Sequence, residues 1–219
     1  SVPGGEGLEP HRSDVMEREL EQLRTYYDIT VRDVMCLDSS NIRPEEWQLI
    51  ARTVFENRAG FDGIVVSHGT DTMAYAAAML HYLIQNSRKP IVLTGAQIPI
   101  EKRDTDAREN LTDAFLYASD ASACGVHIVF GDKIIAATRA RKTRTKSFNA
   151  FSSVDFPNLG VIRDGKLIQY IKTPKSDKPE FFLELNDKVG LLTLTPGMNG
   201  ELLDAYFRYY DGVVLAGYG

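Results

Sequence analysis

The chain has 219 residues, of which 43% are hydrophobic, and its formal net charge at pH 7 is −5. This length allows one large domain, or one domain and part of another, to bury a sizeable core. The negative charge gives no general attraction to nucleic-acid backbones or anionic lipids, so we expect neither as a partner. No apolar run approaches the roughly 20 residues of a membrane helix, and we expect no signal peptide. We expect Cys36 and Cys124 to be buried thiols without a disulfide.

The N-terminal part predicts a loop, two helices and a strand. Residues 1–10 are rich in Gly and Pro and predict a loop, either a lid over a site or a frayed terminus. A helix is expected next, because apolar residues recur at helical spacing at Met16, Leu20, Leu23 and Tyr27. Residues 29–37 predict a strand. After the polar residues 38–41, Pro44 and two acids predict the start of a second helix, whose inward side chains are Trp47, Ile50, Ala51 and Val54.

A strand, a polar turn and a helix follow one another at residues 62–84. The β-branched run Ile64-Val65-Val66 is typical of a strand that is buried on both faces of a parallel sheet. The polar turn at residues 68–72 leads into a helix whose apolar stripe is Met73, Ala76, Ala77, Leu80, Leu83 and Ile84. Open α/β sheets bind ligands beyond the carboxyl ends of their strands, near helix N-termini. We therefore interpret this turn, with Thr70 and Asp71, as the functional site.

The next strand ends in a turn of small residues. Residues 89–99 predict a buried strand, and the Gly and Ala at residues 95–96 let a ligand approach the backbone. Residues 107–119 predict a helix that Asp104 or Asp106 caps, with Leu111, Ala114, Phe115 and Ala118 facing inward.

Alternating strands and helices predict an α/β fold. Residues 125–130 predict a fourth strand, and residues 160–170 a hairpin around Asp164-Gly165. We expect residues 1–172 to form a three-layer, flavodoxin-like domain with a mostly parallel sheet.

A linker and the start of a second domain are expected after residue 172. Residues 173–188 predict the linker, because the segment TPKSDKPE carries two prolines and charges and nothing to bury. Residues 189–219 predict the beginning of a smaller α/β domain, with strands at 189–194 and 212–216 around a helix at 202–209.

Two polar clusters follow strands, at residues 38–41 and 68–72. If the strands are parallel, both clusters lie at the same edge of the sheet. Asp38, Ser39 and Ser40 are also ordinary helix caps, and the sequence leaves both interpretations open.

A threonine hydroxyl becomes a nucleophile only when a neighbouring base takes its proton. For Thr70 the candidates are His68, which fits a buried structural histidine better, and a lysine from elsewhere. The basic run TRARKTRTK at residues 138–146 supplies lysines. It also fits a phosphate or nucleic-acid patch, although it lacks the interleaved aromatics of single-strand binders. A solvated surface strand or hairpin is the simpler alternative.

Several motifs together resemble the L-asparaginase family. The segment IVVSHGTDTMAY at residues 64–75 looks like the second signature of that family, and LDSSNI with PEEW at residues 37–47 resembles its type I, intracellular branch. TGAQIP at residues 94–99, DARENL at residues 106–111 and the pair Lys142-Thr143 also match in order and spacing. The similarity covers essentially the whole chain.

The resemblance implies a catalytic triad and a pocket for a small amino acid. Lys142 and Asp71 would activate the hydroxyl of Thr70. Ser39 would hold the substrate α-carboxylate and Asp71 its ammonium, while the backbone of Ala96 would meet the side-chain amide. The implied substrate-binding residues are Asp38, Ser39, Ser40, Gly69, Asp71 and Ala96.

The implied reaction is hydrolysis of L-asparagine, or of L-glutamine, through an acyl-enzyme, with neither a metal ion nor a cofactor. The resemblance also implies a cytoplasmic homodimer or homotetramer, in which a neighbouring subunit helps to complete each site. The family's first signature, which carries another essential threonine, would stand before Ser1, and without it we expect little or no turnover. Leu8 stands where relatives often have a tyrosine.

Two other functions are alternatives to an L-asparaginase. One is the asparaginase-like subunit of a tRNA-dependent amidotransferase, which would release ammonia for a partner and bind tRNA. The other is an inactive module that binds an amino acid through Ser39 and Asp71 without turning it over.

Overall fold

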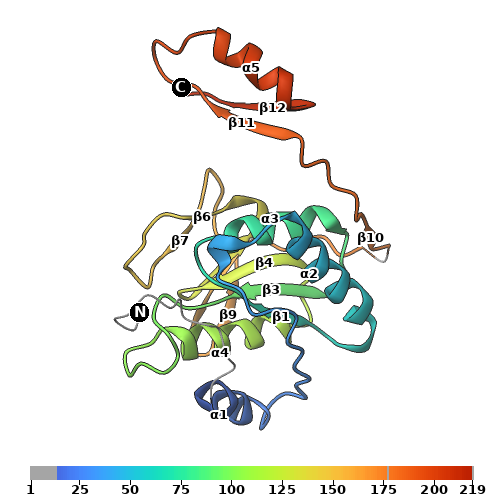
Figure 1. Ribbon diagram of the computed structural model, residues 1–219. Coiled ribbons are helices and arrows are strands. Elements are labelled where there is room, and N and C mark those ends of the chain that lie inside the picture. The colour runs from blue at the N-terminus through green and yellow to red at the C-terminus, as the bar shows by residue number, and fades with distance from the viewer. Residues whose placement is uncertain (1–13, 177, 219) are drawn as a thin grey trace. The chain divides into compact units, whose positions relative to one another are not determined.

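A computed structural model describes residues 14–176 and 178–218, so the expected loop at residues 1–10, with Leu8, lies outside the described residues. The chain divides into two compact units, residues 1–183 and 184–219 (Figure 1). Each unit is described by itself.

The first unit is built on a six-stranded sheet with the order β1-β3-β4-β5-β8-β9. Its strands are β1 (Ile64–Ser67), β3 (Pro90–Thr94), β4 (Gly125–Phe130), β5 (Lys133–Ala136), β8 (Gly160–Arg163) and β9 (Lys166–Gln169). β1, β3 and β4 are parallel, and β8 runs in the same direction because it is antiparallel to β5, which is antiparallel to β4. Only β5 and β9 run the other way. The expected α/β fold with a mostly parallel sheet is confirmed.

Helices cover both faces of this sheet. Figure 1 shows α2 (Pro44–Asn57) and α3 (Met73–Leu83) on one side and α4 (Ala107–Ala118) on the other. The predicted stripe of α3 is buried, with Met73, Ala76, Ala77 and Leu80 fully inaccessible to solvent. On α2, Ile50, Ala51 and Val54 are buried as expected. The sheet therefore lies between two helical layers, as a three-layer domain requires.

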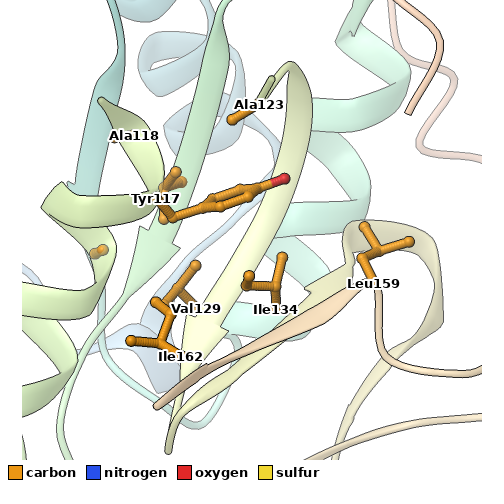
Figure 2. Packing of buried hydrophobic residues seen from close by; sticks show 9 residues of the cluster. Tyr117, Ala118, Ala123, Val129, Ile134, Leu159 and Ile162 are labelled. Carbon is orange, nitrogen blue, oxygen red and sulfur yellow. The ribbon is translucent and has the colours of Figure 1, made fainter. Parts of the chain in front are cut away.

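A hydrophobic cluster between α4 and the sheet joins this helix to four strands. Figure 2 shows Tyr117 of α4 among Val129, Ile134 and Ile162, which come from β4, β5 and β8, and Val92 of β3 belongs to the same cluster. Full burial of one such aliphatic side chain stabilises the fold by about 1.5 to 3 kcal/mol. This cluster therefore fixes β3, which leads into the turn at Gly95, and Val65 of β1, the strand before the Thr70 turn, packs against it.

The predicted helix is α1 (Asp14–Leu23), which ends before Tyr27, the last residue of the apolar stripe. Its Leu20 and Leu23 pack against Leu111 of α4, with Tyr27 beside them. The ion pair between Arg108 and Glu19, at 2.7 Å, ties the same two helices together.

Residues 28–38 form no strand, so the strand predicted at residues 29–37 is wrong. A strand exists only when a neighbouring strand satisfies its backbone groups, and no described strand pairs with this segment. β1 is the end strand of the described sheet, so Ile64, Val65 and Val66 are only half-buried. We predicted full burial for both β1 and β3, and it is wrong for β1 and confirmed for β3.

Two hairpin turns of the sheet, of which the one at Asp164-Gly165 was predicted, contain residues in the left-handed region. Gly131 and Asp132, between β4 and β5, have φ of 54° and 65°. Asp164 and Gly165, between β8 and β9, have φ of 51° and 66°. Turns of this kind match the twist of antiparallel strands and favour Gly and Asp.

Two small sheets complete the first unit. β6 (Ala140–Lys142) pairs with β7 (Phe151–Ser153) to form a hairpin. β2 (Ile84–Gln85) pairs with β10 (Glu180–Phe181), where Phe181 stacks on Phe55 with ring centroids 4.3 Å apart. The segment predicted as a linker, residues 173–188, therefore belongs to the first unit as far as residue 183. The prediction was based on the composition of residues 173–180, which does not reveal that Phe181 packs on Phe55.

The second unit contains β11 (Val189–Thr193), α5 (Glu201–Tyr209) and β12 (Gly212–Ala216). β11 and β12 are parallel and are connected through α5, as the sequence predicts. Gly190 of β11 lies close to Tyr210, the residue that follows α5: a Cβ atom at Gly190 would stand 2.6 Å from the Tyr210 ring. Whether residues 189–219 begin a further domain stays a prediction.

Cys36 and Cys124 form no disulfide, as expected. Cys124 is also buried, as expected, but Cys36 is exposed, because residues 28–38 do not join the sheet. In the part of the chain that the structure describes, every helix is too short or too polar to cross a bilayer.

Candidate active site

Three residues from two distant segments meet at one point. Nζ of Lys142 lies 2.8 Å from Oγ1 of Thr70 and 2.6 Å from Oδ1 of Asp71, although Lys142 and Thr70 are 72 residues apart in the chain. The structure therefore brings together the hydroxyl, the carboxylate and the amine that the sequence singled out.

The turn that carries Thr70 and Asp71 is an extension of the sheet. The N–H of His68 donates to the carbonyl of Thr94 at 2.8 Å, which continues the pairing of β1 with β3 beyond the last strand residue. The helix α3 begins at Met73, so Asp71 lies beside the first turn of a helix, where a negative charge is favoured.

Lys142 is the last residue of β6 and stands opposite the buried Phe151 of β7. Its side chain is 14% exposed, whereas the side chain of Asp71 is 63% exposed. A sheltered ammonium requires a counter-charge, which Asp71 provides. The pair thus holds a cation against the threonine hydroxyl and leaves a carboxylate open to solvent.

Gln97 is a contact of Thr70 that the sequence analysis missed. The Thr70 hydroxyl donates to Oε1 of Gln97 at 3.0 Å. The signal was present, because Gln97 directly follows the small residues of the predicted turn after β3. Its amide side chain could have been noted there.

Ser39 reaches the same edge of the sheet, as predicted for the two polar clusters. It is 7% exposed, and the hydroxyl of Thr72 donates to its carbonyl at 2.8 Å. A Cβ atom at Gly69 would stand 2.5 Å from Oγ of Ser39. Glycine at this position therefore lets the serine hydroxyl approach the backbone of the Thr70 turn.

Asp38 and Ser40 are exposed on either side of Ser39. Oδ1 of Asp38 accepts a hydrogen bond from the N–H of Ser40 at 2.8 Å, at the start of the short helix η1 (Ser39–Asn41). Asp38 therefore caps η1, whereas the N-cap of the predicted helix α2 is Arg43, and only Ser39 of the three lies buried beside the Thr70 turn.

The turn after β3 passes very close to the turn after β1. A Cβ atom at Gly95 would stand 2.2 Å from the carbonyl oxygen of His68, so no side chain fits there without movement. Ala96 follows, half-buried, between Gly95 and Gln97. Its backbone lies in the segment that borders Thr70.

One of our alternatives expected the side chain of Asp106 to cap α4. It makes no capping hydrogen bond. Thr105 Oγ1 accepts from the N–H of Ala107 at 3.0 Å instead. The buried carboxylate of Asp106 accepts from the backbone N–H groups of Gln97 and Ile98, each at 3.0 Å. Asp106 therefore fixes the turn after β3.

His68 is half-buried, and its Nδ1 lies 2.8 Å from the carbonyl oxygen of Gly69. Burial lowers the pKa of His68, although this backbone contact opposes the shift. The ring contact is thus with the backbone, which fits a structural role better than that of a base for Thr70.

The basic side chains of residues 138–146 lie in two different environments. Arg141, Arg144 and Lys146 are exposed, whereas Lys142 is turned toward Thr70. The simpler interpretation, a surface hairpin, is correct for its position in the fold. Among the described residues, no cluster of His, Cys, Asp and Glu could hold a metal ion.

The family model described as "Asparaginase, N-terminal" matches residues 3–176. The chain belongs to the asparaginase family. Its N-terminal part therefore has the fold that this family shares, and the matched residues include the segments that carry Thr70 and Ser39.

Three proteins of known name are similar to this chain. The L-asparaginase of Thermococcus kodakarensis is 40% identical over 192 residues, which cover 87% of this chain and 58% of that protein. A glutamyl-tRNA(Gln) amidotransferase subunit from Methanosphaera stadtmanae is 33% identical over 94% of this chain and 50% of its own length. The crystal structure of a probable cytoplasmic L-asparaginase from Campylobacter jejuni has a TM-score of 0.83 and 35% identity, and the match covers 94% of this chain and 68% of that one. This chain thus spans 50 to 58% of the length of the two curated relatives.

Proposed function

We propose that the protein hydrolyses the side-chain amide of L-asparagine to give L-aspartate and ammonia. The observation that carries this proposal is the position of Lys142, whose amine contacts both Thr70 and Asp71. Family membership supports the reaction class, because the L-asparaginase of Thermococcus kodakarensis belongs to the same family.

A small zwitterion needs hydrogen-bond donors for its carboxylate and an acid for its ammonium. Asp71 is exposed enough to take the substrate ammonium while it pairs with Lys142. The hydroxyl of Ser39, which faces Gly69, is the proposed donor to the α-carboxylate, with Asp38 and Ser40 at the rim. The backbone of Ala96 is the proposed contact of the side-chain amide. These groups would hold the amide carbon next to Thr70.

The proposed acylation uses Thr70 as the nucleophile. Only protein in which Nζ of Lys142 has lost its proton reacts in this step: Nζ takes the hydroxyl proton as Oγ1 bonds to the amide carbon, and backbone N–H groups stabilise the oxyanion. The resulting ammonium then gives its proton to the leaving nitrogen, so the C–N bond breaks and ammonia departs. An ester between Thr70 and the aspartyl group remains.

The proposed deacylation repeats these steps with water. Lys142 takes a proton from water, the hydroxide oxygen bonds to the ester carbon, and the bond to Oγ1 breaks as Thr70 regains the proton. Aspartate is released. The arrangement is the Ser-Lys type of catalysis with a threonine hydroxyl in place of serine.

L-Glutamine is a second substrate to test, since it differs from asparagine by one methylene, which a pocket distinguishes by only about 1 to 3 kcal/mol. We also propose a cytoplasmic homodimer or homotetramer. The likeness to a probable cytoplasmic L-asparaginase supports the location.

Ammonia release tests the reaction. The full-length gene product should release ammonia from L-asparagine, and Thr70→Val should abolish release while asparagine still binds in calorimetry. Thr193→Val, in the second unit, is a matched control. Near-normal turnover by Thr70→Val would exclude this hydroxyl from the chemistry.

A second candidate function is the ammonia-producing subunit of a tRNA-dependent amidotransferase. The observation in its favour is the similarity to the amidotransferase subunit of Methanosphaera stadtmanae, over 94% of this chain. The exposed Arg141, Arg144 and Lys146 are its available basic surface. Tight tRNA binding that weakens steeply with added salt would favour it over the first proposal.

An inactive amino-acid-binding module is the third candidate. It requires only Ser39 and Asp71, which the structure places on neighbouring turns. Binding of asparagine without ammonia release by the full-length gene product would favour it.

A further inference from the structure

Gln97 lies where three segments of the site meet. Its Oε1 accepts the Thr70 hydroxyl at 3.0 Å. Its Nε2 donates to the carbonyl oxygens of Arg144 and Ser147 over longer distances of 3.4 and 3.3 Å. A carbonyl oxygen only accepts hydrogen bonds, so Nε2 must face these two groups and Oε1 must face Thr70. The orientation of the amide is thereby determined.

The segment that Nε2 contacts is the loop that follows Lys142. Its hydrogen bonds include several inside the hairpin: the N–H groups of Thr143 and Arg144 both donate to the carbonyl of Ala150, at 2.8 and 3.3 Å. The Gln97 amide connects this loop to the turn after β3. The distance between Lys142 and Thr70 therefore depends on a contact outside the hairpin.

The backbone of Gln97 is itself held firmly. Both oxygens of Asp106 lie 3.0 Å from its N–H, and the neighbouring N–H of Ile98 donates to the same carboxylate. Asn110 donates to Asp106 at 3.1 Å and to the carbonyl of Gly95 at 2.9 Å. Asp106 and Asn110 are 7% and 1% exposed, so this network is fixed within the core.

We propose that Gln97 is a positioning residue for Thr70 and Lys142. A hydroxyl has one hydrogen. In the resting arrangement it points to Oε1 of Gln97, which holds Oγ1 beside Nζ of Lys142, and it must turn from Oε1 to Nζ before Lys142 takes the proton. The same amide holds the loop at residues 144–147, so that Lys142 arrives at a set distance. Asp106 acts through Gln97. This role rests on the proposed hydrolysis, in which Lys142 receives the proton from Thr70.

The kinetic test is Gln97→Met, which keeps the side-chain length and removes both polar atoms. We expect kcat for asparagine to fall about 10- to 100-fold, because small misplacements of reacting groups cost this much. KM should change less than about twofold, since Gln97 holds the catalytic groups and no substrate group. Gln22→Met, on the exposed face of α1, is the matched control and should leave both constants unchanged.

A measurement without turnover separates this role from the proposed reaction. The NMR signal of Lys142 in [13Cε]lysine-labelled protein, assigned by its loss in Lys142→Met, should move in Gln97→Met and stay in place in Gln22→Met. If the wild type releases no ammonia but the signal moves, the positioning role holds and the proposed reaction fails. An unmoved signal, or an unchanged kcat in an active protein, overturns the role of Gln97. If Gln97→Met does not fold, Gln97→Ala is used for both measurements.

Discussion

The two regions that meet at the site are built in different ways. The turn that carries Thr70 continues the pairing of β1 with β3, and it packs on the buried strand β3 and on the network around Asp106. The hairpin that carries Lys142 consists of two strands of three residues each, and most side chains of residues 141–149 are exposed. One region therefore provides rigidity, while the other delivers a single functional side chain. Their contributions to stability and to chemistry should be separable.

The largest expected effect is that of Lys142→Met. Loss of the amine should reduce ammonia release by about 10⁴-fold, as removal of a catalytic base does in related triads. The melting temperature should change little, because the hairpin is held in the core by Phe151, which this substitution leaves in place. Lys146→Met, at an exposed position of the same loop, is the control. Equal activity of the two variants would remove Lys142 from the mechanism.

The pH dependence of stability should come from the rigid region, through His127 of β4. Its Nδ1 and Nε2 lie 3.0 and 3.3 Å from the hydroxyls of Tyr117 and Thr173, and burial lowers its pKa to about 4, with a smaller effect of His81. The unfolded chain binds a proton near pH 6.5, so His127 contributes fully above that pH, and its contribution is lost as the pH falls toward 4.

The His127 contribution to the unfolding free energy should fall by about 2 kcal/mol between pH 7 and pH 5. Burial raises the pKa of Asp113 to about 6, and this carboxyl opposes the loss over the same range. Urea unfolding of the wild type and of His127→Gln at both pH values measures the His127 contribution, and the variant should lose less. An identical pH dependence in the two proteins would show that His127 does not titrate as its burial implies.

Gly95→Ala tests the close approach of the two turns. A Cβ atom 2.2 Å from the carbonyl oxygen of His68 forces the backbone to move, so we expect a loss of about 1 to 3 kcal/mol in stability. Urea unfolding should show it, and Gly60→Ala, where the added methyl group meets nothing within 4 Å, is the control. Equal stability of both variants would mean that the turns adjust without cost.

The smallest effect is expected for Arg141→Ala. The side chain is exposed on the hairpin, and surface substitutions of this kind change stability by less than about 0.5 kcal/mol. Asparagine hydrolysis should also be unchanged. A marked loss of tRNA affinity in this variant, measured at several salt concentrations, would instead support the amidotransferase candidate.

The sequence predicted what depends on local pattern. The strand, turn and helix around Thr70 follow from a β-branched run and a helical stripe, and the resemblance to a family selected Lys142 from a basic run of several cations. What failed depends on partners elsewhere in the chain. Residues 29–37 have strand-like composition but no described strand to pair with, and Phe181 finds Phe55 across a long sequence separation. Gln97 and Asp106 have roles that only the folded geometry reveals.

The ion pair of Lys142 and Asp71 is unequally open to water, at 14% and 63% exposure. Dissolved ions reach the acidic member far more easily than the basic one, and mobile ions screen open charges more strongly than sheltered ones. Raising the ionic strength should therefore weaken the capture of a cationic amino group before it disturbs the lysine-to-threonine contact. An assay in salt would then show a rising KM at a nearly constant kcat.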